Sequence, residues 1–188
     1  DPDDPIVPDP DKPLEVLDVS GLNFGEFLFS GMHWNYWNSM EAPADDWKST
    51  GDLSKWKHGA SPLGWGDRDA GTPFTMPAAD RAITNYFVRD VNFGTLSADF
   101  ELVLNVRADD GAVVYVNGAE VKRINMPEGK IDADTRASSN VSISAAKTNT
   151  VTIAVPRDVL KDRISVEEHA NYAGAVSVSF DLQASLLR

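Results

Sequence analysis

"FELVLNVRADDGAVVYVNGAEVKRI", residues 100–124, holds three strand patterns separated by two turns. From 100 to 108 apolar residues alternate with polar ones, as in a strand that buries one face. The runs "AVVYV" at 112–116 and "EVKRI" at 120–124 are separated by Asn117 and Gly118. Both of these residues readily take the positive φ of a type I′ turn, so the two runs are predicted to pair as a hairpin.

The same pattern recurs toward the C-terminus and defines the fold class. Residues 176–186 alternate strictly, which predicts a long antiparallel strand with one wet face. Many short strands bounded by turn residues are typical of an all-β protein, here an antiparallel β-sandwich or jelly roll with long aromatic-rich loops. Further strands are expected at 141–143, 150–155 and 163–169, and the one helical turn at 156–162.

The segment from 31 to 85 differs, because it contains all five tryptophans and little alternation. We expect long loops laid over one end or face of the sandwich, where function is often located. Flat exposed rings stack on the apolar faces of sugars, although large aromatic side chains are more often buried. The candidate ligand-binding residues are Trp37, Trp47, Trp56 and Trp65, with Trp47 and Trp56 as the expected exposed pair.

The bulk composition limits the possible partners. The chain has 29 acidic and 17 basic residues and a formal net charge of -12, which disfavours nucleic acid and anionic membranes as partners. It has no cysteine, so disulfides, thiolate metal sites and a cysteine nucleophile are excluded. No apolar run approaches the roughly 20 residues that span a bilayer.

The first residues, "DPDDPIVPDPDKP" at 1–13, read as a stiff acidic linker rich in proline. Residues 14–188 are then expected to form a single β-sandwich domain. Such a linker is typical of chains that carry several modules, so we expect the sequence to be a piece of a longer protein.

Two acidic turns are the candidate metal sites. Asp67 and Asp69 in "GDRDAG" resemble the opening of an oxygen-rich calcium loop, although no bidentate acid follows at the EF-hand distance. Asp109 and Asp110 are the second candidate pair, and the two turns could supply ligands to one calcium ion if they meet. The alternative for both pairs is ordinary turn chemistry, in which aspartate bonds nearby backbone amides.

No catalytic constellation is recognisable. The three histidines, His33, His58 and His169, show no zinc-ligand spacing, and there is no nucleophile elbow or phosphate loop. Glu167 and His169 should share one face of their strand, with Glu168 on the other. We expect His169 to be a hydrogen-bonded structural residue and the protein not to be an enzyme.

An ordered series of motifs carries a family resemblance over most of residues 30–187. The series is "SPLGWGDRDAGT" at 61–72, "NYFVRDVNF" at 85–93, "ADDGAVVYVNGAEVKRINMPEG" at 108–129 and "ISVEEHAN" at 164–171. It resembles a galactose-binding-like β-sandwich accessory domain of bacterial secreted multidomain proteins. The chain departs from that family at "DRDAG", where "DGDE" is usual, and at "ISVEEHANYAG", where "IAVEVHQ" is usual.

The resemblance implies a non-catalytic module found beside catalytic or adhesive domains. Similar sandwiches, PA14-type domains included, often bind sugars through calcium or serve as spacers. We therefore expect a secreted or cell-surface bacterial module that binds carbohydrate or another surface ligand, with calcium as the candidate cofactor, and that tethers a neighbouring domain. The alternative is a structural spacer or interaction module with no small-molecule ligand.

Overall fold

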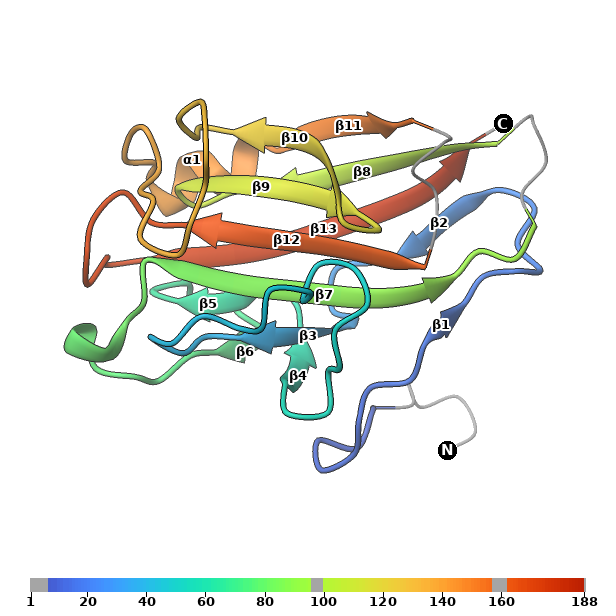
Figure 1. The fold of residues 1–188 in the computed structure, drawn as a ribbon, viewed down its shortest axis with the longest axis horizontal. Helices are drawn as coiled ribbons and strands as arrows, with labels where there is room; N and C mark the ends of the chain where they lie inside the picture. The colour runs from blue at the N-terminus through green and yellow to red at the C-terminus, as the bar shows by residue number, and fades with distance from the viewer. Residues whose placement is uncertain (1–6, 96–99, 157–161, 188) are drawn as a thin grey trace.

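The computed structural model describes residues 7–95, 100–156 and 162–187 and contains two facing β-sheets (Figure 1). The fold is the expected β-sandwich. The first sheet contains β1 (Leu17–Asp18), β3 (His33–Trp37), β4 (Lys57–Ala60), β7 (Thr84–Asn92), β9 (Gly111–Val116), β10 (Ala119–Ile124) and β12 (Arg163–His169). The second contains β2 (Gly25–Leu28), β5 (Leu63–Trp65), β6 (Thr72–Pro73), β8 (Glu101–Arg107), β11 (Val151–Val155) and β13 (Val178–Leu187).

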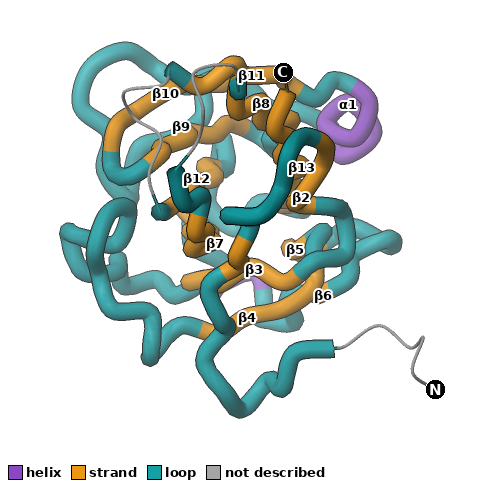
Figure 2. The backbone as a smooth tube through the Cα atoms, turned by 90° about the vertical axis from the view of Figure 1, so that its right-hand side faces the viewer, coloured by secondary structure: helices purple, strands orange, loops and turns teal. Residues whose placement is uncertain are grey.

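Neighbouring strands in each sheet often come from distant parts of the chain. The first sheet runs β10-β9-β12-β7-β3-β4, with β1 added in parallel to β7. The second runs β11-β8-β13-β5-β6, with β2 paired to β13. Seen end-on, the strands surround one interior, and the short helix α1 (Ile143–Thr148) lies beside the second sheet (Figure 2). A 3₁₀ turn, η1 (Ala78–Asp80), precedes β7.

The core lies between the sheets and follows from strand alternation. In β8 the burial alternates residue by residue, as its sequence predicts. At the centre Phe87 of β7 stacks on Phe180 of β13 with ring centroids 4.0 Å apart, and Trp34 meets Phe180 edge-on at 5.0 Å. Offset and edge-to-face pairs of this kind add to the stability gained from burial alone.

The expected hairpin between β9 and β10 is confirmed. Ala119 pairs with Val116, and Asn117 and Gly118 have φ values of 50° and 82°. These are the left-handed conformations that a type I′ turn needs.

Several sequence expectations need correction. Residues 141–143 are not a strand, because the Ser142 hydroxyl accepts from the Ala145 amide and caps the N-terminus of α1. The segment 31–85 is not all loop, since β3, β4, β5 and β6 lie within it. The last strand begins at Val178, two residues later than expected, and Val176 is exposed. Most of the helical turn expected at 156–162 lies outside the described residues.

Candidate functional site

The outer face of the first sheet carries a cluster of aromatic side chains. Alternation turns Tyr86 of β7 and Tyr115 of β9 away from the core, and the loop between β3 and β4 lays Trp47 over both. The Trp47 ring meets Tyr86 edge-on at 4.9 Å and Tyr115 edge-on at 5.9 Å. These contacts fix the rings at one place on the sheet.

The tryptophans expected to bind ligand fall into two places. Trp37, Trp47 and Trp56 come together on this face, with ring centroids 5.7 Å apart for Trp37 and Trp56 and 6.4 Å for Trp47 and Trp56. The expected exposure of Trp47 is wrong, because only 8% of its surface is accessible, and Trp56 is half-buried. Trp65 is buried in the core, where its Nε1 donates to Ala175 O at 2.7 Å.

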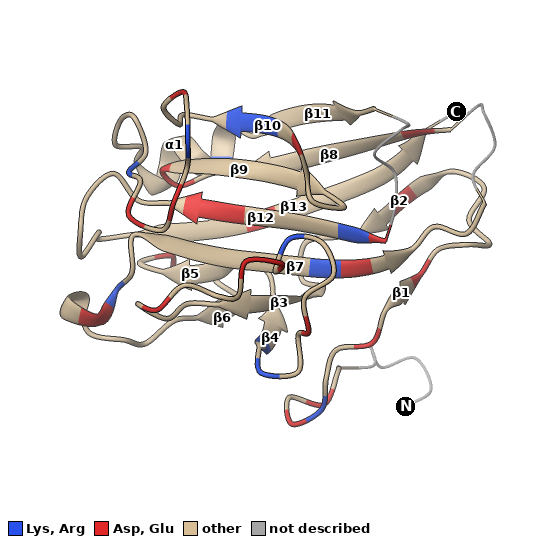
Figure 3. Ribbon diagram, viewed as in Figure 1, with Lys and Arg blue, Asp and Glu red and all other residues tan. Residues whose placement is uncertain are grey.

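A cleft of about 510 Å³ opens beside this cluster. Its lining includes Trp47, Tyr86, Tyr115, Glu167 and the segment 130–134. Acidic residues of β12 and of the surrounding loops are visible in Figure 3. The cleft thus combines aromatic rings with charged groups, the composition that fixes and orients small ligands.

A hydrogen-bonded chain of side chains orients Glu167 at the cleft. His169 Nδ1 lies 2.6 Å from Thr135 O and 3.0 Å from the Thr84 hydroxyl, which itself donates to a backbone carbonyl. Nδ1 therefore faces two acceptors and carries a proton. Nε2 lies 2.7 Å from Glu167 Oε1, so a hydrogen bond joins this imidazole to this carboxyl group. The other oxygen, Glu167 Oε2, accepts from the Tyr115 hydroxyl at 3.2 Å.

The two tyrosines stay protonated hydroxyl donors. Burial, followed by the charge of Glu167, raises the pKa of Tyr86 and of Tyr115 well above the ordinary value of about 10. Lys48 lies over the ring of Tyr115 with its Nζ 4.4 Å from the centroid. That cation–π contact places a positive charge on the wall of the cleft, which Lys48 helps to line.

His169 has the structural role that its strand position predicts, and Glu167 is on the same face while Glu168 is on the other. The sequence did not identify Glu167, Tyr86 or Tyr115 as site residues. Strand alternation alone places Tyr115 and Glu167 on one kind of face. It does not show which loops cover that face.

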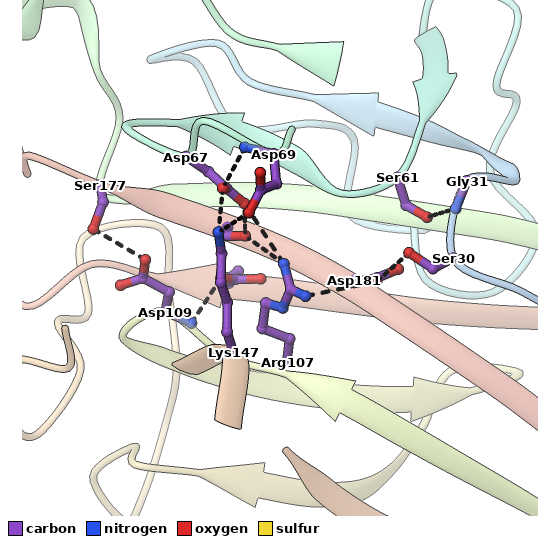
Figure 4. Close-up of polar contacts among 12 residues, drawn as sticks. Ser30, Gly31, Ser61, Asp67, Asp69, Arg107, Asp109, Lys147, Ser177 and Asp181 are labelled. Carbon is purple, nitrogen blue, oxygen red and sulfur yellow. Dashed lines mark hydrogen bonds and ion pairs between the residues drawn. The ribbon is translucent and has the colours of Figure 1, made fainter. Parts of the chain in front are cut away.

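The first acidic turn holds an amino group of the protein itself (Figure 4). Lys147 of α1 lies 2.6 Å from Asp67 Oδ1 and 2.9 Å from Asp69 Oδ2. Ser179 donates to Asp67 Oδ2 at 2.9 Å, and Arg107 Nη1 lies 3.6 Å from the same oxygen. Burial raises the pKa of Asp67, but the hydrogen bonds from Lys147, Asp69 N and Ser179 outweigh it, so the net shift is downward.

The second acidic turn, Asp109 and Asp110, forms hydrogen bonds to residues of other loops. Ser177 donates to Asp109 Oδ2 at 3.0 Å, and Asp110 accepts from the amides of Val141 at 2.6 Å and Asn171 at 2.8 Å. These partners lie far away in the sequence, so Asp110 does not serve its own turn as the simpler interpretation expects. Both candidate turns converge on the start of β13, through Ser177 and Ser179.

Glycines allow that convergence. A Cβ on Gly64 would collide with Val178 O, and a Cβ on Gly66 would collide with Val176 O. The "GWG" run therefore lets the chain before Asp67 lie directly against the chain that leads into β13. Within the described residues no group of three His, Cys, Asp or Glu side chains is placed to hold a metal ion. Calcium binding stays a prediction.

Two acids are buried together at this end of the interior. The Asp109 amide donates to Glu168 Oε1 at 2.8 Å, while Asp109 Oδ1 and Glu168 Oε2 have no partner among the described residues. Burial raises the pKa of Glu168 well above its ordinary value and that of Asp109 to about 7, with a further contribution from the charge of Asp110. Both carboxyl groups thus favour the protonated form.

The other two histidines meet at the edge formed by β3 and β4. His33 Nδ1 and His58 Nδ1 lie 2.9 Å apart, so one proton is shared between them. His58 Nε2 donates to Asp9 O at 3.1 Å and Lys12 O at 2.8 Å. Part of the proline-rich segment is thereby held against the sandwich. The sequence spacing of these histidines gave no indication of the pair.

No protein-family model and no curated protein matches the chain. Solved structures do. A β-glucuronidase from Bacteroides uniformis superposes with a TM-score of 0.57 at 12% identity over 88% of this chain and 18% of its own. A glycosyl hydrolase family 2 member from Bacteroides cellulosilyticus gives 0.56 at 13% over 89% and 21%. A β-glycosidase from Bacteroides vulgatus gives 0.50 at 14% over 85% and 20%.

The described chain therefore spans about a fifth of the length of these structures. At such identities the likeness establishes the β-sandwich fold alone. No helix in the described part of the chain is long and apolar enough to cross a bilayer.

Proposed function

We propose that this chain is a non-catalytic accessory module that binds carbohydrate in the cleft beside Trp47, Tyr86 and Tyr115. The observation that carries the proposal is the cleft itself, in which three fixed rings meet an oriented carboxyl group, Glu167. Rings contact the apolar faces of sugars, and carboxylate and phenol groups bond their hydroxyls.

The similar solved structures support an accessory role beside a glycosidase domain, but they do not identify a ligand. They are glycosidases, and the shared fold covers only a small part of each. A module of this size beside a catalytic domain fits the galactose-binding-like accessory class in bacterial secreted proteins. Its role would be to hold the neighbouring domain near its polysaccharide, because tethering raises the effective concentration of the second partner.

Calcium is a separate part of the proposal. The carboxylates of Asp67 and Asp69 bond Lys147, so an ion at this pair would have to displace an ammonium group that is 2.6 Å from Asp67. This arrangement does not fit a resident calcium ion at Asp67 and Asp69. The dependence on calcium is decided by a chelator arm in the binding experiment.

The second candidate function is a spacer that packs against its own neighbouring domain. Two exposed phenylalanines favour it: Phe24 is 64% and Phe29 is 48% accessible, and they flank β2. Large exposed apolar side chains contribute to many interaction surfaces. The attachment of residues 9–12 to His58 would also fix the angle at which a preceding domain leaves the sandwich.

The deciding experiment is retention of the purified protein on a panel of soluble and insoluble polysaccharides, with calcium and with chelator. Glu167→Gln keeps the shape of the side chain but replaces the carboxyl group that bonds Tyr115 and His169, so it should weaken retention at least about fivefold, as one lost hydrogen bond predicts. Glu101→Gln, at an exposed position on the other sheet, is the matched control and should bind normally.

The possible outcomes distinguish the binding module from the spacer. Retention that Glu167→Gln removes and Glu101→Gln keeps supports the cleft as the binding site. Retention that neither variant changes excludes this cleft. Absence of retention on the whole panel excludes carbohydrate binding for those polysaccharides and favours the spacer.

A further inference from the structure

The outer face of the second sheet carries a separate polar cleft, on the opposite side of the sandwich from the aromatic one. Asn105 of β8 pairs with Gln183 of β13, and Arg107 pairs with Asp181. Their chain neighbours point into the core, so alternation turns these four side chains outward together. The strand register alone therefore places these four polar side chains in one row.

The cleft has a volume of about 220 Å³. Its lining consists of Asn105, Arg107, Lys147, Thr150, Asp181 and Gln183, so every lining residue is polar or charged. Pockets for drug-sized ligands measure roughly 300–1,000 Å³, so this one is suited to a smaller molecule. Figure 4 shows Arg107, Lys147 and Asp181 grouped beside the Asp67 turn.

Three buried polar atoms at this cleft have no partner among the described residues. They are Asn105 Oδ1, Arg107 Nε and Asp181 Oδ1. Asp181 is 7% accessible, and its other oxygen accepts from the Ser30 hydroxyl at 2.7 Å. A buried polar atom without a partner is costly, and in native proteins it usually finds water, an ion or a ligand.

The charges around the cleft largely compensate one another. Lys147 is paired with Asp67 and Asp69, and Arg107 lies 3.6 Å from Asp67 and 4.0 Å from Asp181. The polar groups that remain can both donate and accept hydrogen bonds. They are the acceptor oxygens, the Arg107 Nε–H, the Thr150 hydroxyl and the Gln183 amide. This profile matches a neutral ligand with several hydroxyl groups better than an anion or a cation.

We infer that this cleft binds a single neutral sugar residue, by hydrogen bonds and without an aromatic platform. The inference stands apart from the proposed function, since it uses no residue of the aromatic cleft. If both sites bind, one module engages two sugars on opposite faces, and linking two weak sites raises avidity for a polysaccharide when both can be reached at once.

The test is a titration of the ¹⁵N-labelled protein with methyl glycosides of neutral hexoses and of a hexuronic acid, followed by backbone amide shifts. Saturable shifts at residues 105, 107, 150 and 183 with a neutral glycoside are expected, with weaker binding of the hexuronate. Gln183→Ala should weaken that binding about fivefold, as expected for one lost hydrogen bond. Ser185→Ala, two residues farther along the same face of β13, is the matched control.

Thr150→Val provides a second variant outside the strands, should Gln183→Ala lower the melting temperature. Glu167→Gln should leave these shifts unchanged, which separates this site from the aromatic cleft. Saturable shifts that Gln183→Ala or Thr150→Val weakens and Ser185→Ala does not would support the inference. Absence of saturable shifts at these four amides, which would mean ordered water only, overturns it, as does equal weakening by Ser185→Ala.

Discussion

The two outer faces of the sandwich obey the same alternation rule but carry different chemistry. On the first sheet, outward side chains such as Tyr86 and Tyr115 meet Trp47 from a long loop and form an apolar layer. On the second, outward side chains such as Arg107 and Asp181 line a cleft with Lys147 from α1, and ion pairs join Arg107 to Asp181 and Lys147 to Asp67. The difference teaches that alternation fixes which positions face outward, while the residues at those positions and the segment that covers them together decide the chemistry of the face.

The largest effect is expected from a substitution that detaches the Trp47 loop, which covers the aromatic face. Arg163 is buried on β12, where it forms a bidentate pair with Asp90 and donates to the carbonyls of Trp47 and Gly51 at 2.9 and 3.0 Å. Arg163→Met should lower the free energy of unfolding by about 3 kcal/mol, because Asp90 and two carbonyls lose a buried cation. It should also weaken glycan retention, since the Trp47 loop loses its anchor.

Urea denaturation measures this change against Arg123→Met, which removes a more exposed pair with Glu120 and should have a much smaller effect on stability. Equal losses for the two variants would show that Arg163 does not hold the loop in place.

The two buried acids between the sheets should make the free energy of unfolding depend on pH. The folded protein holds protons on Glu168 and Asp109 to higher pH than the unfolded chain does, because burial raises both pKa values, that of Asp109 to about 7. The free energy of unfolding should therefore fall as pH rises from about 5 to 8.

Glu168→Gln keeps an oxygen to accept from the Asp109 amide but cannot ionise. At pH 8 it should be more stable than the wild type by about 1–3 kcal/mol, and at pH 4 the two should be similar. Chemical denaturation across this range measures the difference. A constant offset between the two proteins would contradict the assignment.

A smaller effect is expected on the charged face. Lys147→Met leaves the buried Asp67 carboxylate without its closest cation and should cost about 1–2 kcal/mol at pH 7, since Lys147 itself is partly exposed. The folded pKa of Asp67 is lowered, so this contribution is present above the unfolded value of about 4 and is lost as pH falls through the folded value.

Thermal unfolding of Lys147→Met at pH 7 and pH 3 tests the sign, with Lys122→Met at an exposed position of β10 as the control. A loss that is as large at pH 3 as at pH 7 would show that Lys147 acts by packing and not by charge.

The sequence predicts the strands more completely than the site because strand signals are local. Alternation in β8 and the Asn117-Gly118 turn depend on neighbours in the chain, and both are confirmed. The strand expected at 141–143 fails because three apolar-polar positions are too few to separate a strand from the first turn of a helix, and Ser142 caps a helix.

The site residues depend on contacts between distant segments. Lys147 reaches Asp67 across 80 positions, and Glu167 meets Tyr115 across 52. The aspartates Asp67 and Asp69 carry a pattern that predicts a cation, and the cation in the structure is an ammonium group of the chain. No periodicity in the sequence identifies that partner.

The last and smallest effect concerns the segment held by His58 at the edge of the first sheet. Burial, with contributions from the charges of His58 and Arg89, lowers the pKa of His33 below its ordinary value of about 6.5. A second proton on the pair would place two N–H groups against each other at 2.9 Å. The carbonyls of Asp9 and Lys12 in the held segment bond His58, and the side chains of these two residues form an ion pair with each other.

The folded chain thus binds fewer protons here than the unfolded one, so this contribution to stability is present above about pH 6.5 and is lost as pH falls. The chain has no cysteine, so Asp11→Cys gives a single site for a spin label. The label should become more mobile as pH falls through the lowered pKa of His33 in the folded state, and His33→Phe, which removes the facing imidazole, should abolish that change. A label at Glu128→Cys, far from the pair in sequence and on an exposed loop, should not respond. Mobility that is independent of pH at Asp11→Cys would show that the second proton does not release the segment.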